Sequence, residues 1–248
     1  MTRGALIIVN PGDPTAENYC KGVYKDRDHY IAFLKTAFGG LWRPTEIRVL
    51  NQPDVSAVRA EVQRLGFCDY SMVVFSGHGY HSTSDDSTIV ELSDDVFLDS
   101  NYLKADSPKQ TLILDCCRLP DVPMQLTEEL SKSLKPAVNL NDLACRLYYE
   151  ERIQKCPEDI TVLHACSKGQ TAGDDESTGG YYSYPLLKGA ELWAGETSLK
   201  DTENTYYVYS VVRAHEAAAE NLKKARRRQV PSIEKARSGP YFPLGIVA

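Results

Sequence analysis

Two stretches of the sequence decide the fold: residues 71–79 read SMVVFSGHG, and residues 111–118 read TLILDCCR. Each begins with a short apolar run that contains β-branched side chains, a pattern typical of a buried strand. Each run then breaks into polar residues, which include His78 in the first stretch and Cys117 in the second. Ligands and reactive groups in a parallel sheet lie just beyond the carboxyl ends of the strands. If the two strands are neighbours, His78 and Cys117 emerge side by side at one edge of the sheet.

The same alternation of apolar runs and helix-length stretches continues along the chain. Strands are expected at Ala5–Asn10, Glu46–Leu50, Ser71–Phe75, Thr111–Leu114, Ile160–Ala165 and Tyr241–Val247. Helices are expected at Arg27–Phe38, Val55–Leu65 (with Asp54 as N-cap), Leu140–Ile153, Tyr181–Trp193 and Tyr206–Arg226. Thr88–Leu92 and Val96–Leu98 predict a small hairpin between the third and fourth strands. The sequence therefore predicts a single α/β domain over residues 1–248, with a doubly wound, mainly parallel six-stranded sheet flanked by helices.

Composition and charge limit the classes of protein to which this chain can belong. The chain has 248 residues, a formal charge of −6 and a sequence pI near 5.4, which argue against a nucleic-acid partner. The basic run 223–228 suggests a nucleic-acid patch or, more simply, positive charge at a helix C-terminus. No apolar stretch is long enough for a membrane helix, and residues 5–9 are too short an apolar run for a secretory signal. The seven cysteines show no CxxC pair, so we expect reduced thiols and a cytoplasmic location.

The histidine and the cysteine together predict a nucleophilic site. Taken singly, His78 could be a solvated loop residue, and a buried cysteine could be a small hydrophobic side chain. Taken together at the ends of consecutive strands, they form the arrangement that a thiol nucleophile and its proton shuttle need. Glycines on both sides of His78 allow the backbone to turn sharply there.

These residues resemble the caspase superfamily of cysteine peptidases, in particular the metacaspases and paracaspases. The resemblance rests on the hydrophobic run ending in Ser-Gly-His-Gly (76–79) and on the run ending in Asp-x-Cys (115–117). It extends to CSKGQTAGD (166–174), which is followed by GGYYSY (179–184), and to RQVP (228–231) before the expected final strand. The resemblance implies a caspase-like fold over nearly the whole chain.

The resemblance also implies roles for particular residues. Cys117 corresponds to the family nucleophile, and strand alternation agrees, because it turns Cys116 the other way into the packing. His78 would shuttle protons through a thioacyl intermediate, and the N–H groups of Gly79 and Cys117 would form the oxyanion hole. Arg118 after the nucleophile is nearer to the paracaspase pattern than to the His-Ser-Gly of metacaspases.

The family pattern places four residues in the pocket for the side chain before the cut. They are Asp26, Ser76, Asp115 and Asp174. Carboxylates in a confined pocket favour a cation, so cleavage after arginine or lysine is expected. Two alternatives stay open: Asp26 could be a helix N-cap, and Asp115 a hydrogen-bonded carboxylate at a strand end. A third alternative is a hydrolase specific for aspartate or for an uncharged residue.

Further expectations concern cofactors, processing and partners. No cofactor is required, although calcium activation is considered because Asp85, Asp86, Asp94 and Asp95 form an acidic loop that could equally be solvated. The halves 1–118 and 159–248 would be joined by a variable linker, 119–158, where a basic-specific enzyme could cut itself. Candidate cleavage sites there are Lys132, Arg146, Arg152 and Lys155, whereas Lys135 precedes a proline. The expected partner is a protein or peptide substrate with a basic residue before the cut, and a homodimer through the last strand is considered. The alternative function is a proteolytically silent caspase-like interaction domain.

Overall fold

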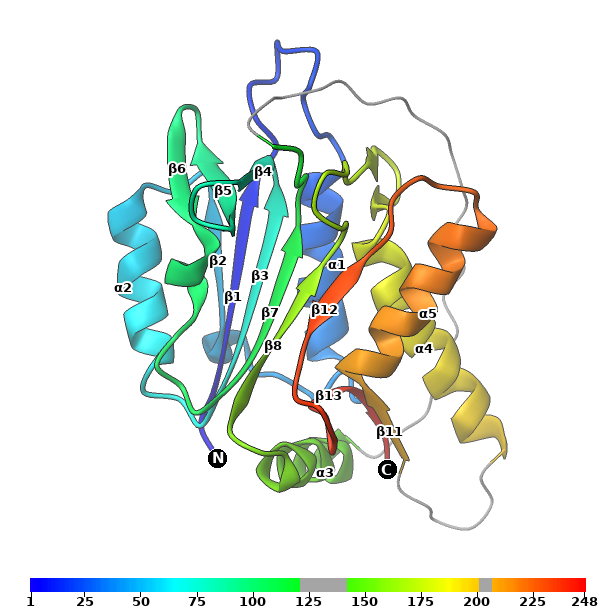
Figure 1. Cartoon of the computed structure of the whole chain (residues 1–248). Coiled ribbons are helices and arrows are strands. Elements are labelled where there is room, and N and C mark those ends of the chain that lie inside the picture. Colours follow the sequence, from blue (N-terminus) through cyan, green and yellow to red (C-terminus); the bar gives the residue numbers. More distant parts are fainter. Residues whose placement is uncertain (121–141, 201–206) are drawn as a thin grey trace.

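A six-stranded sheet forms the centre of the protein, whose structure is a computed structural model that describes residues 1–120, 142–200 and 207–248 (Figure 1). Its strands are β1 (Arg3–Asn10), β2 (Ile47–Asn51), β3 (Tyr70–Gly77), β7 (Lys109–Asp115), β8 (Asp159–His164) and β12 (Ser232–Glu234). They lie in the order β12-β8-β7-β3-β1-β2, and every neighbouring pair is parallel except β12 with β8. The predicted doubly wound, mainly parallel sheet is therefore confirmed.

Alternation along the strands sorts the core into two layers. On β1, Ile7 packs into one hydrophobic cluster, whereas Leu6 and Ile8 pack into the other. All eight residues of β1 are buried, as expected for a central strand that is covered on both faces. The apolar runs in which polar and apolar residues do not alternate are thus the strands in the middle of the sheet.

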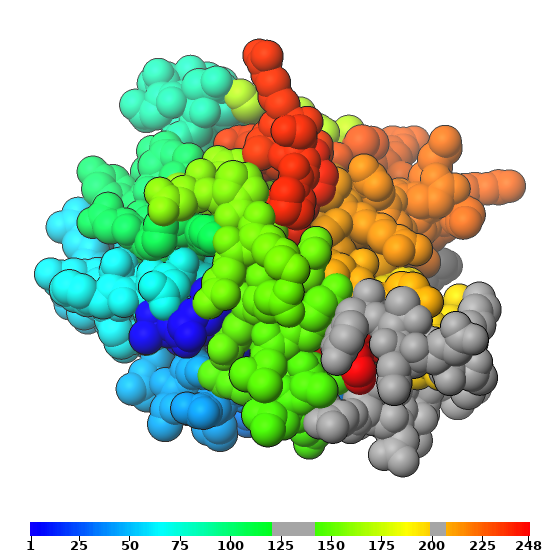
Figure 2. Space-filling model, turned by 90° about the horizontal axis from the view of Figure 1, so that it is seen from below, coloured from blue at the N-terminus to red at the C-terminus, as the bar shows by residue number. Residues whose placement is uncertain are grey.

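Five helices surround the sheet in the described part of the chain. They are α1 (Val23–Lys35), α2 (Val55–Leu65), α3 (Asp142–Lys155), α4 (Ser183–Lys200) and α5 (Val211–Lys224). Helix α2 covers one face, and α1, α4 and α5 cover the other (Figure 1). Helix α3 lies at the lower end of the molecule, where Figure 2 shows it in green. The predicted N-cap of α2 is confirmed, because Asp54 Oδ1 accepts a 2.7 Å hydrogen bond from the Ala57 N–H.

A three-stranded antiparallel sheet projects beside β3. Its strands are β4 (Gly79–Ser82), β5 (Ser87–Ser93) and β6 (Val96–Asp99). The hairpin predicted between the third and fourth main strands is β5 and β6. Strand β4 has the sequence GYHS, which is too short and too polar to be recognised as a strand. It follows His78 directly, so the histidine lies at the junction of the two sheets.

The sixth strand of the main sheet is not the one that the sequence suggested. That place belongs to β12, whose three residues SIE carry almost no strand signal. The expected final strand, β13 (Pro243–Val247), instead pairs with β11 (Tyr207–Ser210) in a separate two-stranded sheet. All five residues of β13 are buried. Its backbone also accepts a hydrogen bond from Tyr149 Oη at Pro243 and donates one from Ile246 to Phe38. These contacts hold β13 within its own chain, and a homodimer through the last strand stays a prediction.

Helix boundaries differ from the predictions where capping or pairing intervenes. Helix α1 begins at Val23, four residues before the expected Arg27. Helix α5 begins only at Val211, because Tyr207–Ser210 pairs as β11 and the Ser210 hydroxyl accepts a hydrogen bond from the Arg213 N–H. The basic run 223–228 begins in the last turn of α5, as expected for charge that offsets a helix dipole. None of the helices in the described residues combines the length and apolarity needed to cross a membrane.

Candidate active site

The ends of β3 and β7 bring the predicted histidine and cysteine to one edge of the sheet. The two strands are parallel neighbours, and Ser76 on β3 pairs with Asp115 on β7. His78 and Cys117 each follow this pair by two residues. Gly77 allows the chain to turn between Ser76 and His78. Its φ is +152°, and a Cβ there would lie 2.3 Å from the Asn10 carbonyl oxygen. The premise of neighbouring strands, from which the site was predicted, is therefore correct.

The imidazole of His78 is held by the segment that follows β1. Its Nε2 lies 3.2 Å from the Pro11 carbonyl oxygen and 3.7 Å from Cys20 Sγ. A Cβ at Gly12 would lie 2.8 Å from the same Nε2, so the ring packs directly on the backbone at this point. Sequence reasoning missed Pro11 and Cys20 as neighbours of the histidine. The only available signal was that β1 also ends at this edge, in Pro11-Gly12.

Cys117 presents a partly buried thiol to the same edge. Its Sγ donates a 3.4 Å hydrogen bond to the Ala172 carbonyl oxygen. Burial raises the pKa of the Cys117 thiol, the hydrogen bond to Ala172 lowers it, and the charges of Asp115 and Asp174 raise it further. The net effect is a raised pKa, which favours the protonated thiol. Cys116 is only 2% exposed and packs into the core layer on the α2 side, as strand alternation predicted.

Gly79 lies against the chain at the end of β7, where Cys116 and Cys117 follow the strand. A Cβ at Gly79 would be 2.9 Å from Cys116 Sγ and 2.7 Å from the Ile89 carbonyl oxygen. Only glycine therefore lets the β4 backbone approach β7 this closely. The two backbone positions expected to form an oxyanion hole, Gly79 and Cys117, are thus near each other.

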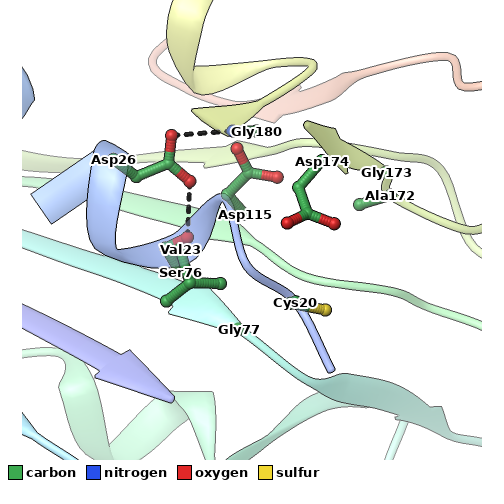
Figure 3. A pocket seen from close by; sticks show the side chains of 10 residues that line it. All are labelled: Cys20, Val23, Asp26, Ser76, Gly77, Asp115, Ala172, Gly173, Asp174 and Gly180. Atoms are coloured by element: carbon green, nitrogen blue, oxygen red, sulfur yellow. Dashed lines mark hydrogen bonds between the residues drawn. The ribbon is translucent and has the colours of Figure 1, made fainter. Parts of the chain in front are cut away.

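A pocket beside these groups is lined by all four residues predicted for substrate binding. The lining residues are Cys20, Val23, Asp26, Ser76, Gly77, Asp115, Ala172, Gly173, Asp174 and Gly180 (Figure 3). They come from α1, from the ends of β3 and β7, and from the segment after β8 with its short strands β9 (Asp174–Asp175) and β10 (Gly179–Gly180). Its free volume is about 20 Å³, roughly the room that one water needs. A long side chain would have to widen it.

Asp26 forms one wall of the pocket. It is 1% exposed, and its carboxylate accepts hydrogen bonds from Ser76 Oγ at 2.6 Å and from the Gly180 N–H at 2.8 Å. The N-cap position of α1 belongs to Gly22, so the alternative of Asp26 as a helix cap is wrong. Burial raises the pKa of Asp26 well above its usual value, and the charge of Asp115 raises it further.

Asp115 and Asp174 complete the acidic lining. Asp115 Oδ2 accepts hydrogen bonds from the Ser183 N–H at 3.0 Å and from Ser183 Oγ at 2.6 Å. Asp174 Oδ2 accepts a 2.6 Å bond from the Gly22 N–H, and Asp174 is the most exposed of the three acids. Burial raises the pKa of both carboxyls, although hydrogen bonds oppose the shift.

Within the described residues the three carboxylates form no ion pair, although the charge of His78 acts on Asp174 and lowers its pKa. No lysine, arginine or histidine of residues 1–120, 142–200 and 207–248 forms an ion pair with Asp26, Asp115 or Asp174. A Cβ at Gly180 would lie 2.4 Å from an Asp115 oxygen and 3.0 Å from an Asp26 oxygen, so this glycine separates the two carboxylates. Like charges held this close favour a ligand that brings positive charge.

The acidic loop considered for calcium does not form a comparable cluster. Asp86 forms ion pairs with Lys168 and His81, and Asp85 accepts hydrogen bonds from Ser82 and Ser84. Among the described residues, no group of three or more histidine, cysteine, aspartate or glutamate side chains is arranged to hold a metal ion.

Comparisons with known proteins agree with this architecture. A family model described as "Caspase domain" matches residues 2–242. The crystal structure of caspase-1 from Spodoptera frugiperda superposes with a TM-score of 0.58 at 15% identity, over 94% of this chain and 86% of that chain. At this identity the likeness concerns the fold alone. No curated protein matches the sequence.

Proposed function

Because the chain belongs to the caspase-domain family of cysteine peptidases, we propose that it is an endopeptidase that cleaves after arginine or lysine, with Cys117 as nucleophile and His78 as proton shuttle. One observation supports the specificity: three carboxyl groups that form no ion pair with any described residue line the pocket between the ends of β3 and β7. A substrate cation would neutralise them. An aspartate before the cut would add a fourth carboxyl group to a pocket in which neighbouring carboxyls already raise the pKa of Asp26 and Asp115.

The reaction begins from the neutral thiol. His78 takes the proton of Cys117 as the sulfur attacks the scissile carbonyl carbon, because the raised pKa of Cys117 disfavours a resting thiolate. The N–H groups of Gly79 and Cys117 donate to the oxygen that becomes negative. His78 then returns the proton to the departing amine, which leaves a thioester on Cys117.

Water completes the cycle with the same groups. His78 removes a proton from a water molecule, whose oxygen attacks the thioester carbon and releases the carboxylic acid and the Cys117 thiol. Throughout, the Pro11 carbonyl acts as a positioning group. It accepts from Nε2–H at 3.2 Å, which leaves Nδ1 of a neutral His78 free to act as the base.

A panel of fluorogenic peptides tests the function. The peptides differ only in the residue before the cut, which is Arg, Lys, Asp or Asn. We expect kcat/KM for Arg and Lys to exceed that for Asp and Asn by at least about 10³-fold, the discrimination typical when a buried charge loses its partner. Equal turnover of all four peptides would refute the basic specificity. No turnover of any, with no labelling by an Arg chloromethylketone, would favour the silent interaction domain.

Protonation of the pocket gives a second test. The pocket carboxyls have raised pKa values, so part of the population is neutral at mildly acidic pH, and a bound guanidinium must drive the protons off. Affinity for an Arg-terminated peptide should therefore fall as pH falls, and binding should release protons. Calorimetry with Cys117→Ala near pH 6, in two buffers of different ionisation enthalpy, measures this release. Binding without proton exchange would contradict the pocket assignment.

Self-processing is proposed at Lys132, which lies outside the described residues. The other candidates, Arg146, Arg152 and Lys155, are in helix α3. Arg146 is further held by Glu46, with a 2.6 Å ion pair. A scissile segment has to be extended, so these helical sites should resist cleavage while the helix is folded. Intact mass after incubation should show fragments from a cut after Lys132 in the wild type and a single mass in Cys117→Ala. Cutting inside α3 instead would overturn this choice.

A further inference from the structure

A second cavity lies on the opposite face of the sheet from α1 and α4. Its volume is about 300 Å³, within the usual range for small-molecule sites. It is lined by Asp86, Ser87, Thr88, Ser100, Asn101, Lys104, Leu112, Arg118, Val162, His164, Lys168 and Glu234. None of these residues lines the acidic pocket. On this face no described helix crosses β8 and β12 (Figure 1).

Four lining side chains carry buried polar atoms that have no hydrogen-bond partner among the described residues. The atoms are Ser87 Oγ, Thr88 Oγ1, Arg118 Nε and His164 Nδ1. Each of these residues is at least nine-tenths buried, with exposures of 2–6%. Buried polar groups are nearly always satisfied, so four orphans around one cavity point to a missing partner. His164 Nε2 lies 3.0 Å from Glu234 Oε1 and must donate to it, which leaves Nδ1 of the neutral ring as an acceptor.

The charges around the cavity leave positive charge in excess. The lining has three cations, Arg118, Lys104 and Lys168, but only two acids. Both acids are engaged: Asp86 with Lys168 and His81, and Glu234 with His164. Within residues 1–120, 142–200 and 207–248, the guanidinium of Arg118 bonds only to neutral oxygens, at Cys166 and Ser232. Lys104 forms no ion pair with any described residue, and its charge lowers the pKa of Glu234 and His164.

The cavity is connected to the nucleophile through a short stretch of chain. Arg118 follows Cys117 directly, its N–H donates to Gln170 O at 2.9 Å, and its carbonyl accepts from the Gly169 N–H at 2.8 Å. Lys168, in the same loop, lines the cavity. Two residues beyond Gln170, the carbonyl of Ala172 accepts the Cys117 thiol. A ligand that holds Arg118 and Lys168 would therefore fix two segments next to Cys117. One is the residue that follows it, and the other is the loop 168–172, which accepts its thiol hydrogen bond.

We propose that this cavity binds a small organic anion, with a phosphate or carboxylate group toward Arg118 and Lys104 and hydroxyl groups toward the orphan side chains, and that binding activates the peptidase. The donors fit an oxyanion, and the acceptor at His164 fits a hydroxyl. Binding does not depend on the proposed peptidase function, whereas activation rests on it. The two parts therefore need separate measurements.

Binding is measured by calorimetry on the full-length Cys117→Ala protein at low ionic strength. The probes are glycerol phosphate, glycerate, inorganic phosphate and, as the neutral control, glycerol. We expect saturable binding of at least one of the two hydroxylated anions, and Lys104→Glu should weaken it by at least about tenfold, the size expected for reversing a charge beside a bound anion. Lys224→Glu makes the same change on the exposed end of α5 and should leave the affinity unchanged.

The outcomes separate the sources of the anion. Glycerol phosphate binding alone assigns a phosphate ester, and glycerate binding alone assigns a carboxylate. Inorganic phosphate binding as tightly as glycerol phosphate would refute the role of the hydroxyl groups. Three results would each overturn the site. They are an affinity for glycerol equal to that for the anions, an anion affinity that Lys104→Glu does not change, and no binding of any probe.

Activation is measured on the wild-type protein with its best peptide substrate. A saturating anion should raise kcat/KM about fivefold, at the lower end of typical coupling between sites. The Lys224→Glu protein should respond equally. Binding without any change in kcat/KM would refute the coupling through Arg118. Binding together with a complete lack of peptidase activity would refute the proposed function and keep the site.

Discussion

Cys117→Ala is expected to lower kcat/KM for an Arg peptide by at least about 10⁴-fold, because the covalent route disappears and only binding and oxyanion stabilisation remain. The fold should be retained, since Cys117 is partly exposed and donates only one hydrogen bond, to Ala172. Steady-state kinetics with the Arg peptide measure the loss. Thermal unfolding of the same preparation checks that the protein stays folded.

Two other cysteines make this experiment specific. Cys68→Ala changes a partly buried free thiol that lies outside the residues lining the site, and it should keep full activity. Cys20→Ala removes the thiol 3.7 Å from His78 Nε2 and should cost far less activity than Cys117→Ala. An inactive Cys20→Ala beside an active Cys117→Ala would transfer the nucleophile to Cys20. That result would leave the fold and the histidine assignment in place.

Asp115→Asn should lower kcat/KM for the Arg peptide by about 10²-fold, because a desolvated charge that faces a bound guanidinium is lost. The asparagine carbonyl can still accept from Ser183, which keeps the local hydrogen bonds. Kinetics with Arg and Asn peptides measure the change in their ratio, which should fall towards unity.

The stability of the same variant separates binding from structure. The folded-state pKa of Asp115 is raised, so its charge destabilises the folded protein once pH exceeds the normal aspartate pKa, and this cost vanishes at low pH. Removing the charge should therefore leave the thermal midpoint at neutral pH unchanged or higher. A large loss of stability with an unchanged Arg to Asn ratio would support the alternative of a structural strand-end carboxylate. Asp54→Asn, the same change at a helix cap that asparagine also satisfies, is the matched control.

The main strands and the position of His78 and Cys117 at one edge of the sheet could be predicted because their signals are local. A fully buried parallel strand is apolar along its whole length, and its end is marked by an abrupt polar break. Ser71–Phe75 and Thr111–Leu114 both carry this signal and end at the same edge of the sheet, so the position of His78 and of a cysteine at that edge followed from the pattern. The choice of Cys117 over Cys116 came from the family resemblance, with strand alternation in agreement. The pocket acids Asp26 and Asp174 also came from family resemblance, because nothing in their immediate sequence distinguishes them from surface aspartates.

Other features had no local signal, because contacts between distant segments create them. The sixth strand of the main sheet is β12, because SIE (232–234) pairs with the free edge of β8. Strand β13 instead pairs with β11, where all five of its residues are buried. The contact of Cys20 with His78 spans 58 residues, and the separation of Asp26 from Asp115 by Gly180 depends on chain folding across 154 residues. The sequence by itself determined the layered α/β fold and the placement of His78 and Cys117 at one edge of the sheet, since periodicity and strand ends are local features of the sequence. Only the tertiary structure decided which carboxylates share a pocket and which polar atoms remain unpaired, since both depend on what each side chain meets after packing.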